Sequence, residues 1–179
     1  FISVKSDTIA LTHATIIDGT GGPIKPDQTI LIIKGKIAQT GEAGKVSVPV
    51  SAKVIDCTGK TIIPGMIMMH EHLFYGEPTP SAYIVQEMPS SFPSLYLAGG
   101  VTTMRTTGSI EPQTDLNIRQ WITEGKTIGP EVDVTGPYIE RSGLPISEML
   151  FIKSPRDAAK EVSYWADMGC TSFKLYMDL

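Results

Sequence analysis

Hydrophobic positions in the first part of the chain fall in short runs that turn residues separate. Residues 9–17 are rich in β-branched and apolar side chains and lead into a Gly-rich turn segment. Residues 29–33 are followed by Lys-Gly-Lys at 34–36 and then by the run 37–40, which is typical of a tight hairpin. The chain up to about residue 60 therefore predicts a small antiparallel sheet. Its few strands leave unpaired edges, which are expected to pair with strands from outside this segment.

The pattern changes after residue 60. Strand-like and helix-like segments alternate from there on, which is typical of parallel βα units. Four strands are expected in this region, at residues 61–70, 100–107, 131–136 and 171–177.

The helix before the last expected strand has the clearest boundaries. Ser154 is a suitable N-cap, and Pro155 fits the first helical position. Asp157 completes a capping box, and Gly169 marks the end of the helix.

Two more helices are expected between the strands. Residues 114–124 carry apolar side chains mostly near helical spacing, and Gly125 ends the segment. A helix before the second strand ends at the glycines 99–100, and Pro89 and Pro93 are expected to interrupt it.

This order of elements predicts an α/β protein. Four βα units form the first half of a (β/α)8 TIM barrel, which usually needs about 250 residues. The expected organisation is part of a small β-sandwich at residues 1–60, then at 61–179 a barrel that stops in mid-domain. A flavodoxin-like open sheet is the alternative, although no Gly-rich phosphate loop follows the first strand.

Composition excludes several classes of function. The 179 residues are 41% hydrophobic and 19% charged, with a mean hydropathy of +0.04, which predicts a globular chain. A net charge of -4 without a basic stripe argues against nucleic acid as a partner. No apolar stretch is long enough for a membrane span, and no signal peptide follows Phe1. Because Phe1 is not Met, residues are expected to be missing upstream, so both a cytoplasmic and an exported location stay open.

The two cysteines, Cys57 and Cys170, are expected to be reduced and structural.

A His-x-His pair ends the first expected strand of the second region. Strand alternation places His70 and His72 on one face, with Cα atoms about 7 Å apart, so that both rings can lean toward one metal ion. Alternation also turns Glu71 away from that ion. The same rule assigns Met66 and Met68 to the histidine face.

The segment around this pair reads Ile-Ile-Pro-Gly-Met-Ile-Met-Met-His-Glu-His-Leu, after a β-rich region. It resembles the amidohydrolase superfamily, as do residues 16–22, 35–37 and 99–103. The resemblance implies that His70 and His72 are ligands of a divalent metal, with zinc as the expected ion and one or two ions bound.

The sequence departs from the family at Met68, where an aspartate is usual. A metallo-β-lactamase would continue the His-x-His pair with x-Asp-His. This chain continues with Leu73, Phe74 and Tyr75, which excludes that rival.

Lys174 lies on the last expected strand. Alternation puts Lys174 on one face with Ser172 and Tyr176, while the other face is apolar and is expected to pack on helices. A buried, unpaired ammonium is costly. The resemblance implies a lysine carboxylated by CO2, whose carbamate bridges two cations as a third ligand group. The alternatives are a lysine paired with a carboxylate and a lysine that reaches solvent.

Residues near the strand ends are candidates for substrate contacts. Tyr75 and Tyr138 follow strand ends, the zone where barrel enzymes bind substrates. Arg105 could bind a substrate carboxylate through two hydrogen bonds or form a structural ion pair. His13 is expected at the surface or in the packing of the sandwich.

The resemblance implies a hydrolase that cuts amide, cyclic amide or peptide-like C–N bonds with a metal-activated water. The family's further histidines and its catalytic aspartate cannot lie in a chain whose three histidines are His13, His70 and His72. The chain alone is therefore expected to be inactive and to associate with itself or with the missing C-terminal half. Small-molecule or dipeptide-like substrates are expected, and the motifs are closest to the imidazolonepropionase and Xaa-Pro dipeptidase-like branches. The alternative is a non-catalytic metal-binding fragment or scaffold that needs a partner chain.

Overall fold

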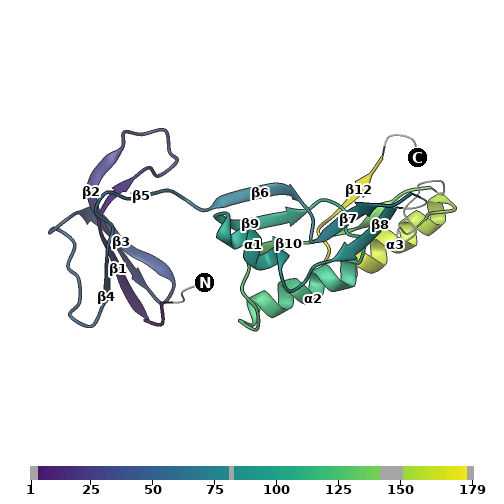
Figure 1. Cartoon of the computed structure of the whole chain (residues 1–179). Helices are drawn as coiled ribbons and strands as arrows, with labels where there is room; N and C mark the ends of the chain where they lie inside the picture. Colours follow the sequence, from purple (N-terminus) through teal and green to yellow (C-terminus); the bar gives the residue numbers. More distant parts are fainter. Residues whose placement is uncertain (1–3, 81–82, 142–150, 177–179) are drawn as a thin grey trace. The chain divides into compact units, whose positions relative to one another are not determined.

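The computed structural model describes residues 4–80, 83–141 and 151–176 (Figure 1). The chain forms two compact units, Phe1–Pro64 and Gly65–Leu179, here called unit 1 and unit 2. The boundary predicted from the sequence was between residues 60 and 61.

Unit 1 is one five-stranded sheet. Its strands are β1 (Thr8–Ile16), β2 (Lys25–Ile33), β3 (Lys36–Glu42), β4 (Lys53–Asp56) and β5 (Thr61–Ile62). The order is β3-β2-β1-β4, and β5 also pairs with β1. The predicted hairpin is confirmed, because Lys34 and Gly35 both have positive φ and Ile33 pairs with Lys36. The prediction of a purely antiparallel sheet is wrong, since β4 and β5 run parallel to β1.

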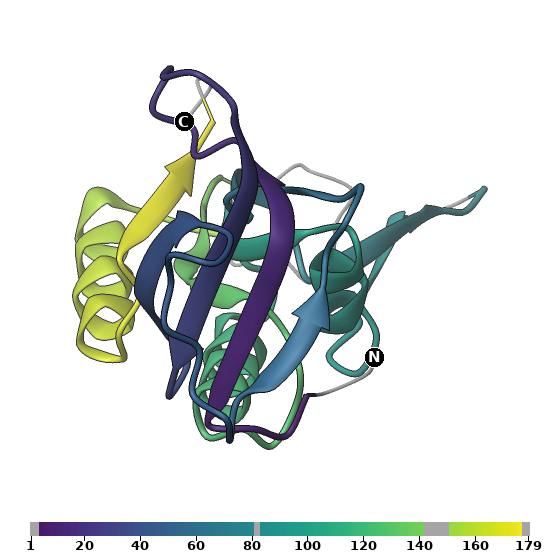
Figure 2. The same cartoon turned by 90° about the vertical axis from the view of Figure 1, so that its left-hand side faces the viewer.

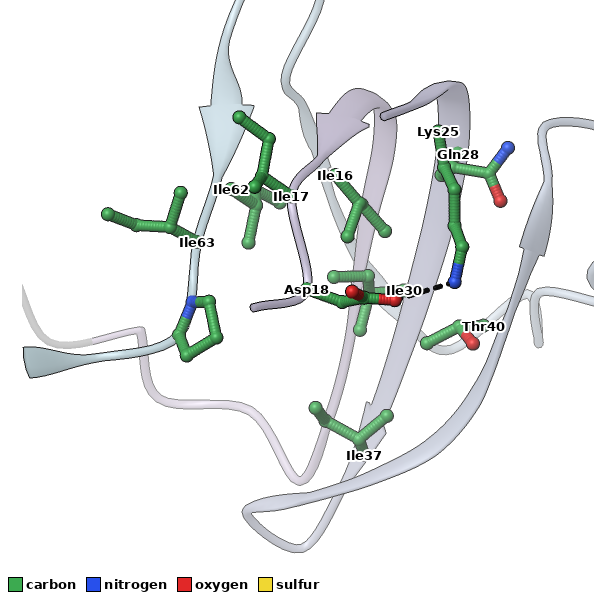
Figure 3. Close-up of a pocket in the computed structure, with 11 residues that line it drawn as sticks. Ile16, Ile17, Asp18, Lys25, Gln28, Ile30, Ile37, Thr40, Ile62 and Ile63 are labelled. Carbon is green, nitrogen blue, oxygen red and sulfur yellow. Dashed lines mark hydrogen bonds and ion pairs between the residues drawn. The ribbon is translucent and has the colours of Figure 1, made fainter. Parts of the chain in front are cut away.

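A cavity of about 300 Å³ opens on this sheet (Figure 3). Isoleucines dominate its lining, and Lys25 Nζ lies 2.7 Å from Asp18 Oδ2 in an ion pair beside them. His13 lies at the surface of unit 1, as predicted, with its Nδ1 2.8 Å from Asp27 Oδ1.

Unit 2 alternates parallel strands with helices, which confirms the α/β prediction. The strands are β6 (Met66–Glu71), β9 (Val101–Thr106), β10 (Glu131–Asp133), β11 (Thr135–Ile139) and β12 (Ser172–Leu175). The helices are α1 (Phe92–Ala98), α2 (Pro112–Thr123) and α3 (Pro155–Asp167). β6 pairs with β9, β9 with β10, and β11 with β12, all in parallel.

Two predicted strands are each divided in the structure. The run 61–70 breaks at Pro64 because proline has no N–H for a strand ladder, so β5 belongs to unit 1 and β6 to unit 2. The run 131–136 divides at Val134 into β10 and β11, which pair with different neighbours. Met177, at the end of the last predicted strand, lies outside the described residues.

A hairpin between β6 and α1 was not predicted. It consists of β7 (Phe74–Pro78) and β8 (Tyr83–Glu87), which pair in antiparallel fashion. Figure 2 shows it projecting from the rest of unit 2. Its sequence contains Gly76 and Pro78, two residues that weaken a strand pattern.

The helix boundaries follow their local chemistry. Ser154 Oγ accepts a hydrogen bond from the Asp157 backbone N–H, which confirms the predicted cap of α3. Pro93 does not interrupt α1 as predicted, because it lies in the first turn, where a missing N–H costs nothing.

The core of unit 2 lies between the parallel strands and the helices. Leu73, Met104, Ile118 and Val134 are fully buried in it. Met68 packs against this layer, so the predicted placement of Met68 on the histidine face is wrong. The physical reason is a register irregularity between Met68 and Glu71, which interrupts strict alternation.

Cys57 and Cys170 are buried and free, as predicted. None of the helices in the described ranges is both long and apolar enough to cross a membrane.

Met104 and Met69 form a matched pair for testing this core, since both lie on parallel strands of unit 2. Met104 is fully buried, whereas Met69 is 59% exposed. Met104→Ala is expected to lower the free energy of unfolding by about 2–5 kcal/mol, and Met69→Ala by less than about 0.5 kcal/mol. Urea unfolding of both variants measures the difference. Equal midpoints would contradict the proposed core.

Candidate metal centre

His70 and His72 come together at the carboxyl end of β6. Their ring centroids lie 5.9 Å apart in an edge-to-face arrangement. His72 Nδ1 lies 3.2 Å from the carbonyl oxygen of Gly108. Only a protonated Nδ1 can donate to a carbonyl, so this contact favours the tautomer that leaves the Nε2 lone pair available to a metal ion.

Lys174 lies near this pair. Lys174 on β12 is the strand partner of Tyr138 on β11. The Lys174 Nζ lies 5.2 Å from the centroid of the Tyr138 ring and 5.3 Å from the centroid of the Tyr176 ring. The two rings stack with centroids 5.9 Å apart. Burial lowers the pKa of Lys174, and two aromatic faces are a favourable setting for its ammonium form.

The charge of Lys174 reaches His72. Burial is the main cause that lowers the pKa of His72, and the positive charge of Lys174 is the second. The structure thus brings His70, His72 and Lys174, the three predicted ligand residues, into one neighbourhood.

The donor set fits a metal ion only in part. Two adjacent imidazoles suit a divalent ion such as zinc, which usually takes four ligands. Within residues 4–80, 83–141 and 151–176, no group of three or more His, Cys, Asp or Glu side chains could hold a metal ion. A protonated lysine cannot serve as a ligand, so the described residues supply two donors and one potential third.

The three candidate substrate residues lie in different settings. Tyr75 is exposed on β7. Arg105 Nε lies 3.8 Å from Asp133 Oδ2, which is the structural ion pair named as its alternative. Tyr138 is buried beside Ile110, and burial raises its pKa. Their roles toward a substrate stay predictions.

A buried network of hydroxyl groups lies next to Gly108, and the sequence analysis missed it. Ser109 Oγ donates to Asp115 Oδ2 and lies 2.8 Å from the Thr135 carbonyl oxygen. Thr135 N donates to Thr106 Oγ1 at 2.9 Å, and Thr135 Oγ1 lies 2.9 Å from Ser172 Oγ. The network ties β9, α2, β11 and β12 together. Its hydroxyl residues are scattered between Thr106 and Ser172 and carry no local sequence signal, so only the fold reveals the network.

Two carboxyl groups close to this network have raised pKa values. Burial, followed by the charges of Asp115 and Glu111, raises the pKa of Glu87 to about 8. Burial also raises the pKa of Asp115 to about 7, although its hydrogen bond from Ser109 opposes the shift. Asp115 Oδ1 is buried and has no hydrogen-bond partner among the described residues, and the buried Glu87 carboxyl group lies near the backbone N–H of Glu111, which lowers its pKa slightly.

Curated relatives match parts of the chain. Over 105 residues the chain is 32% identical to an enamidase from Eubacterium barkeri. This match covers 58% of the chain and 26% of the enamidase. Over 71 residues the chain is 39% identical to an imidazolonepropionase from Psychromonas ingrahamii. This match covers 37% of the chain and 18% of that enzyme. The chain spans about a quarter or less of the length of these relatives.

Solved structures match nearly all of the chain. A Bifidobacterium longum protein assigned as a prolidase superposes with a TM-score of 0.75 and 29% identity, over 94% of this chain and 40% of that protein. A Xaa-Pro dipeptidase superposes with a TM-score of 0.74 and 19% identity, over 94% of this chain and 46% of the dipeptidase, and shows the same fold. No family profile matches the chain.

The fold and the site define an α/β protein with paired imidazoles at the carboxyl end of a parallel strand. Together with these relatives, they support membership of the amidohydrolase superfamily for the part of the chain that the relatives cover.

The stability of unit 2 is expected to fall as the pH rises from about 4 to about 8. The pKa values of about 7 for Asp115 and about 8 for Glu87 exceed the ordinary 3.8 and 4.5, so folding favours the protonated forms. That contribution is complete below the ordinary pKa values, decreases as the pH rises above them, and is gone once the pH has passed about 7 for Asp115 and about 8 for Glu87. Urea unfolding midpoints across this range measure it.

The control removes both titrations. The Asp115→Asn/Glu87→Gln double variant should show a much flatter dependence of stability on pH, whereas Glu131→Gln, at an exposed position, should keep the original slope. An unchanged slope in the double variant would exclude these two carboxyl groups as its source.

Gly108 is expected to tolerate no side chain. Its φ is +87°, and a Cβ there would lie 2.6 Å from the Tyr138 ring. Gly125 has a φ of +69° but no atom within 4 Å of such a Cβ, so it serves as a control for backbone strain alone. Gly108→Ala should cost about 2–4 kcal/mol of unfolding free energy and Gly125→Ala about 1 kcal/mol. Chemical unfolding compares them, and equal losses would contradict the Tyr138 contact.

Proposed function

We propose that the complete protein is a metal-dependent hydrolase that cuts amide, cyclic amide or peptide-like C–N bonds, and that this chain supplies part of its active site. The observation that carries the proposal is the meeting of the His70 and His72 rings at the carboxyl end of β6, with Lys174 close by. The names of the relatives, among them an enamidase and an imidazolonepropionase, support this class of reaction.

We infer that unit 2 is the first half of a (β/α)8 barrel. Its strands β6, β9, β10 with β11, and β12 neighbour one another in chain order among the described residues. In a flavodoxin-like sheet the first strand would instead lie inside the sheet, between the second and third. The carboxyl ends of barrel strands are where such enzymes hold their chemistry, and His70 and His72 lie at such an end.

Unit 1 is proposed as part of a β-sandwich. Its sheet carries the isoleucine-lined cavity shown in Figure 3, and Ile37 and Ile63 at this cavity are largely exposed. An apolar sheet face of this kind is usually covered by a second sheet.

His70 and His72 would hold the divalent ion, for which zinc is expected. A bound zinc ion lowers the pKa of water toward 7 and polarises a carbonyl group, which is the chemistry that hydrolysis requires. The Gly108 carbonyl orients the His72 ring for this role, as outer partners of metal-bound histidines commonly do.

Lys174 is proposed to become a ligand as a carbamate formed with CO2. As an ammonium, its charge opposes both a protonated His72 and a nearby metal cation. Conversion to an anion would replace this repulsion with attraction, and burial already disfavours the charged ammonium.

A small-molecule or dipeptide-like substrate is proposed, with Tyr75, Arg105 and Tyr138 as candidate contacts. The chain is also proposed to associate with itself or with the remainder of the barrel. Exposed apolar side chains on the two outer parallel strands support this, namely Met66, Ile67 and Met69 on β6 and Leu175 on β12.

A second candidate is a non-catalytic metal-binding fragment or scaffold that needs a partner chain. It is favoured by the lack of a group of three conventional metal ligands among the described residues. Hydrolysis of Xaa-Pro dipeptides or cyclic amides by the metal-loaded preparation would exclude the scaffold. Hydrolysis by the isolated 179-residue chain would also contradict the inference that its site is incomplete.

The purified chain is expected to bind about one equivalent of zinc through His70 and His72. His70→Ala and His72→Ala should each weaken binding at least about tenfold, because each removes one of two imidazole donors. His13→Ala is the matched control, since His13 lies in unit 1 and should not affect binding. Isothermal titration calorimetry with zinc measures all four proteins.

Bicarbonate tests the role of Lys174 in the same titration. It should raise the zinc stoichiometry or affinity of the parent chain but not of a Lys174→Arg variant, which keeps a cation that cannot form the carbamate. A parent chain that binds no zinc, with or without bicarbonate, would remove the support for the metal centre.

A further inference from the structure

Tyr96 reaches the His-x-His segment from helix α1. Its hydroxyl lies 2.8 Å from Glu71 Oε2 and 2.9 Å from the carbonyl oxygen of His72. A tyrosine hydroxyl has a single proton, so the two acceptors share one donor. The contact therefore holds both the middle residue of the motif and the backbone of its second histidine.

The ring of Tyr96 is itself held in place. It packs against the core of unit 2 and meets the Phe92 ring edge to face, with centroids 6.3 Å apart. The hydroxyl is thus presented from a packed side chain, which limits the entropy that its hydrogen bonds must overcome.

The contact lies at the end of β6, where it can restrain the backbone of the second histidine. β6 ends at Glu71, which pairs with Thr106 of β9, and His72 follows after the last residue of the strand. Glu71 lies on the helix side, so its carboxylate meets α1 while the two imidazoles meet each other elsewhere. A hydrogen bond to the His72 carbonyl replaces part of the restraint that the strand ladder no longer supplies.

We propose that Tyr96 is a positioning residue for the His70/His72 pair, holding Glu71 and the His72 backbone against α1 so that both imidazoles keep the orientation that binds an ion. The importance of this positioning for metal binding rests on the proposed function, whereas the positioning itself is a property of the chain without metal.

Tyr96→Phe removes the hydroxyl and keeps the ring. Outer partners that orient metal-bound histidines are commonly worth about 10–100-fold in metal affinity, so this variant should weaken zinc binding by about tenfold. Tyr164→Phe is the matched control, because Tyr164 is an exposed tyrosine on α3.

Imidazole NMR signals provide a readout that needs no metal. The chain has three histidines, so it gives three Cε1–H signals, and His13 in unit 1 is an internal reference. The spectra of all variants are recorded at the same pH and without zinc. Tyr96→Phe should shift or broaden the His70 and His72 signals and leave that of His13 unchanged, while Tyr164→Phe should change none.

Unchanged His70 and His72 signals in a folded Tyr96→Phe variant would overturn the proposal. If that variant does not fold, Glu71→Gln replaces it, since the amide weakens the bond and keeps the packing of the ring. The folded Glu71→Gln protein should show smaller shifts of the same two signals, and no shift would overturn the proposal. Shifts of the expected kind in a chain that binds no zinc would support the positioning and contradict the proposed function alone.

Discussion

The parallel strands of unit 2 stay side by side because one apolar layer lies between them and their helices. Leu73, Met104 and Ile118, which are fully buried, come from the segment after β6, from β9 and from α2. Each buried side chain of this size contributes about 1.5–3 kcal/mol of stability. Since parallel strands joined by helices end at the same edge, this packing is what brings His72, Gly108 and Lys174 together.

The two sides of the His-x-His segment face different surroundings. The register irregularity between Met68 and Glu71 lets both of these side chains face the helix layer, although strict alternation would separate them. The imidazoles are left free of that packing. The hydroxyl network from Thr106 to Ser172 fixes the ends of several strands with short-range polar contacts, which tolerate less displacement than an apolar layer does.

Local chemistry in the sequence predicts much of the fold. The cap at Ser154 and the turn at Gly35 could be identified because their signals lie within a few residues. The break at Pro64 was missed, since apolar residues continue on both sides of it and suggest one strand. The β7–β8 hairpin was also missed. Gly76 and Pro78 weaken the strand pattern of this segment, and its pairing depends on contacts that a single sequence does not predict.

The site was predictable in its motif but not in its surroundings. His70 and His72 are separated by one residue, and the context of their strand identifies them. The partners that hold them come from distant positions: Tyr96 is 24 residues from His72, and Gly108 is 36. Such contacts depend on how the helices pack on the strands, which periodicity alone does not determine.

The two buried thiols allow each unit to be followed separately. Cys57 lies in unit 1 and Cys170 in unit 2, and burial raises the pKa of Cys170 to about 11. A thiol that is both covered and protonated reacts slowly with alkylating reagents. The rate at which each cysteine becomes labelled therefore reports how often its own unit opens, without the introduction of any probe.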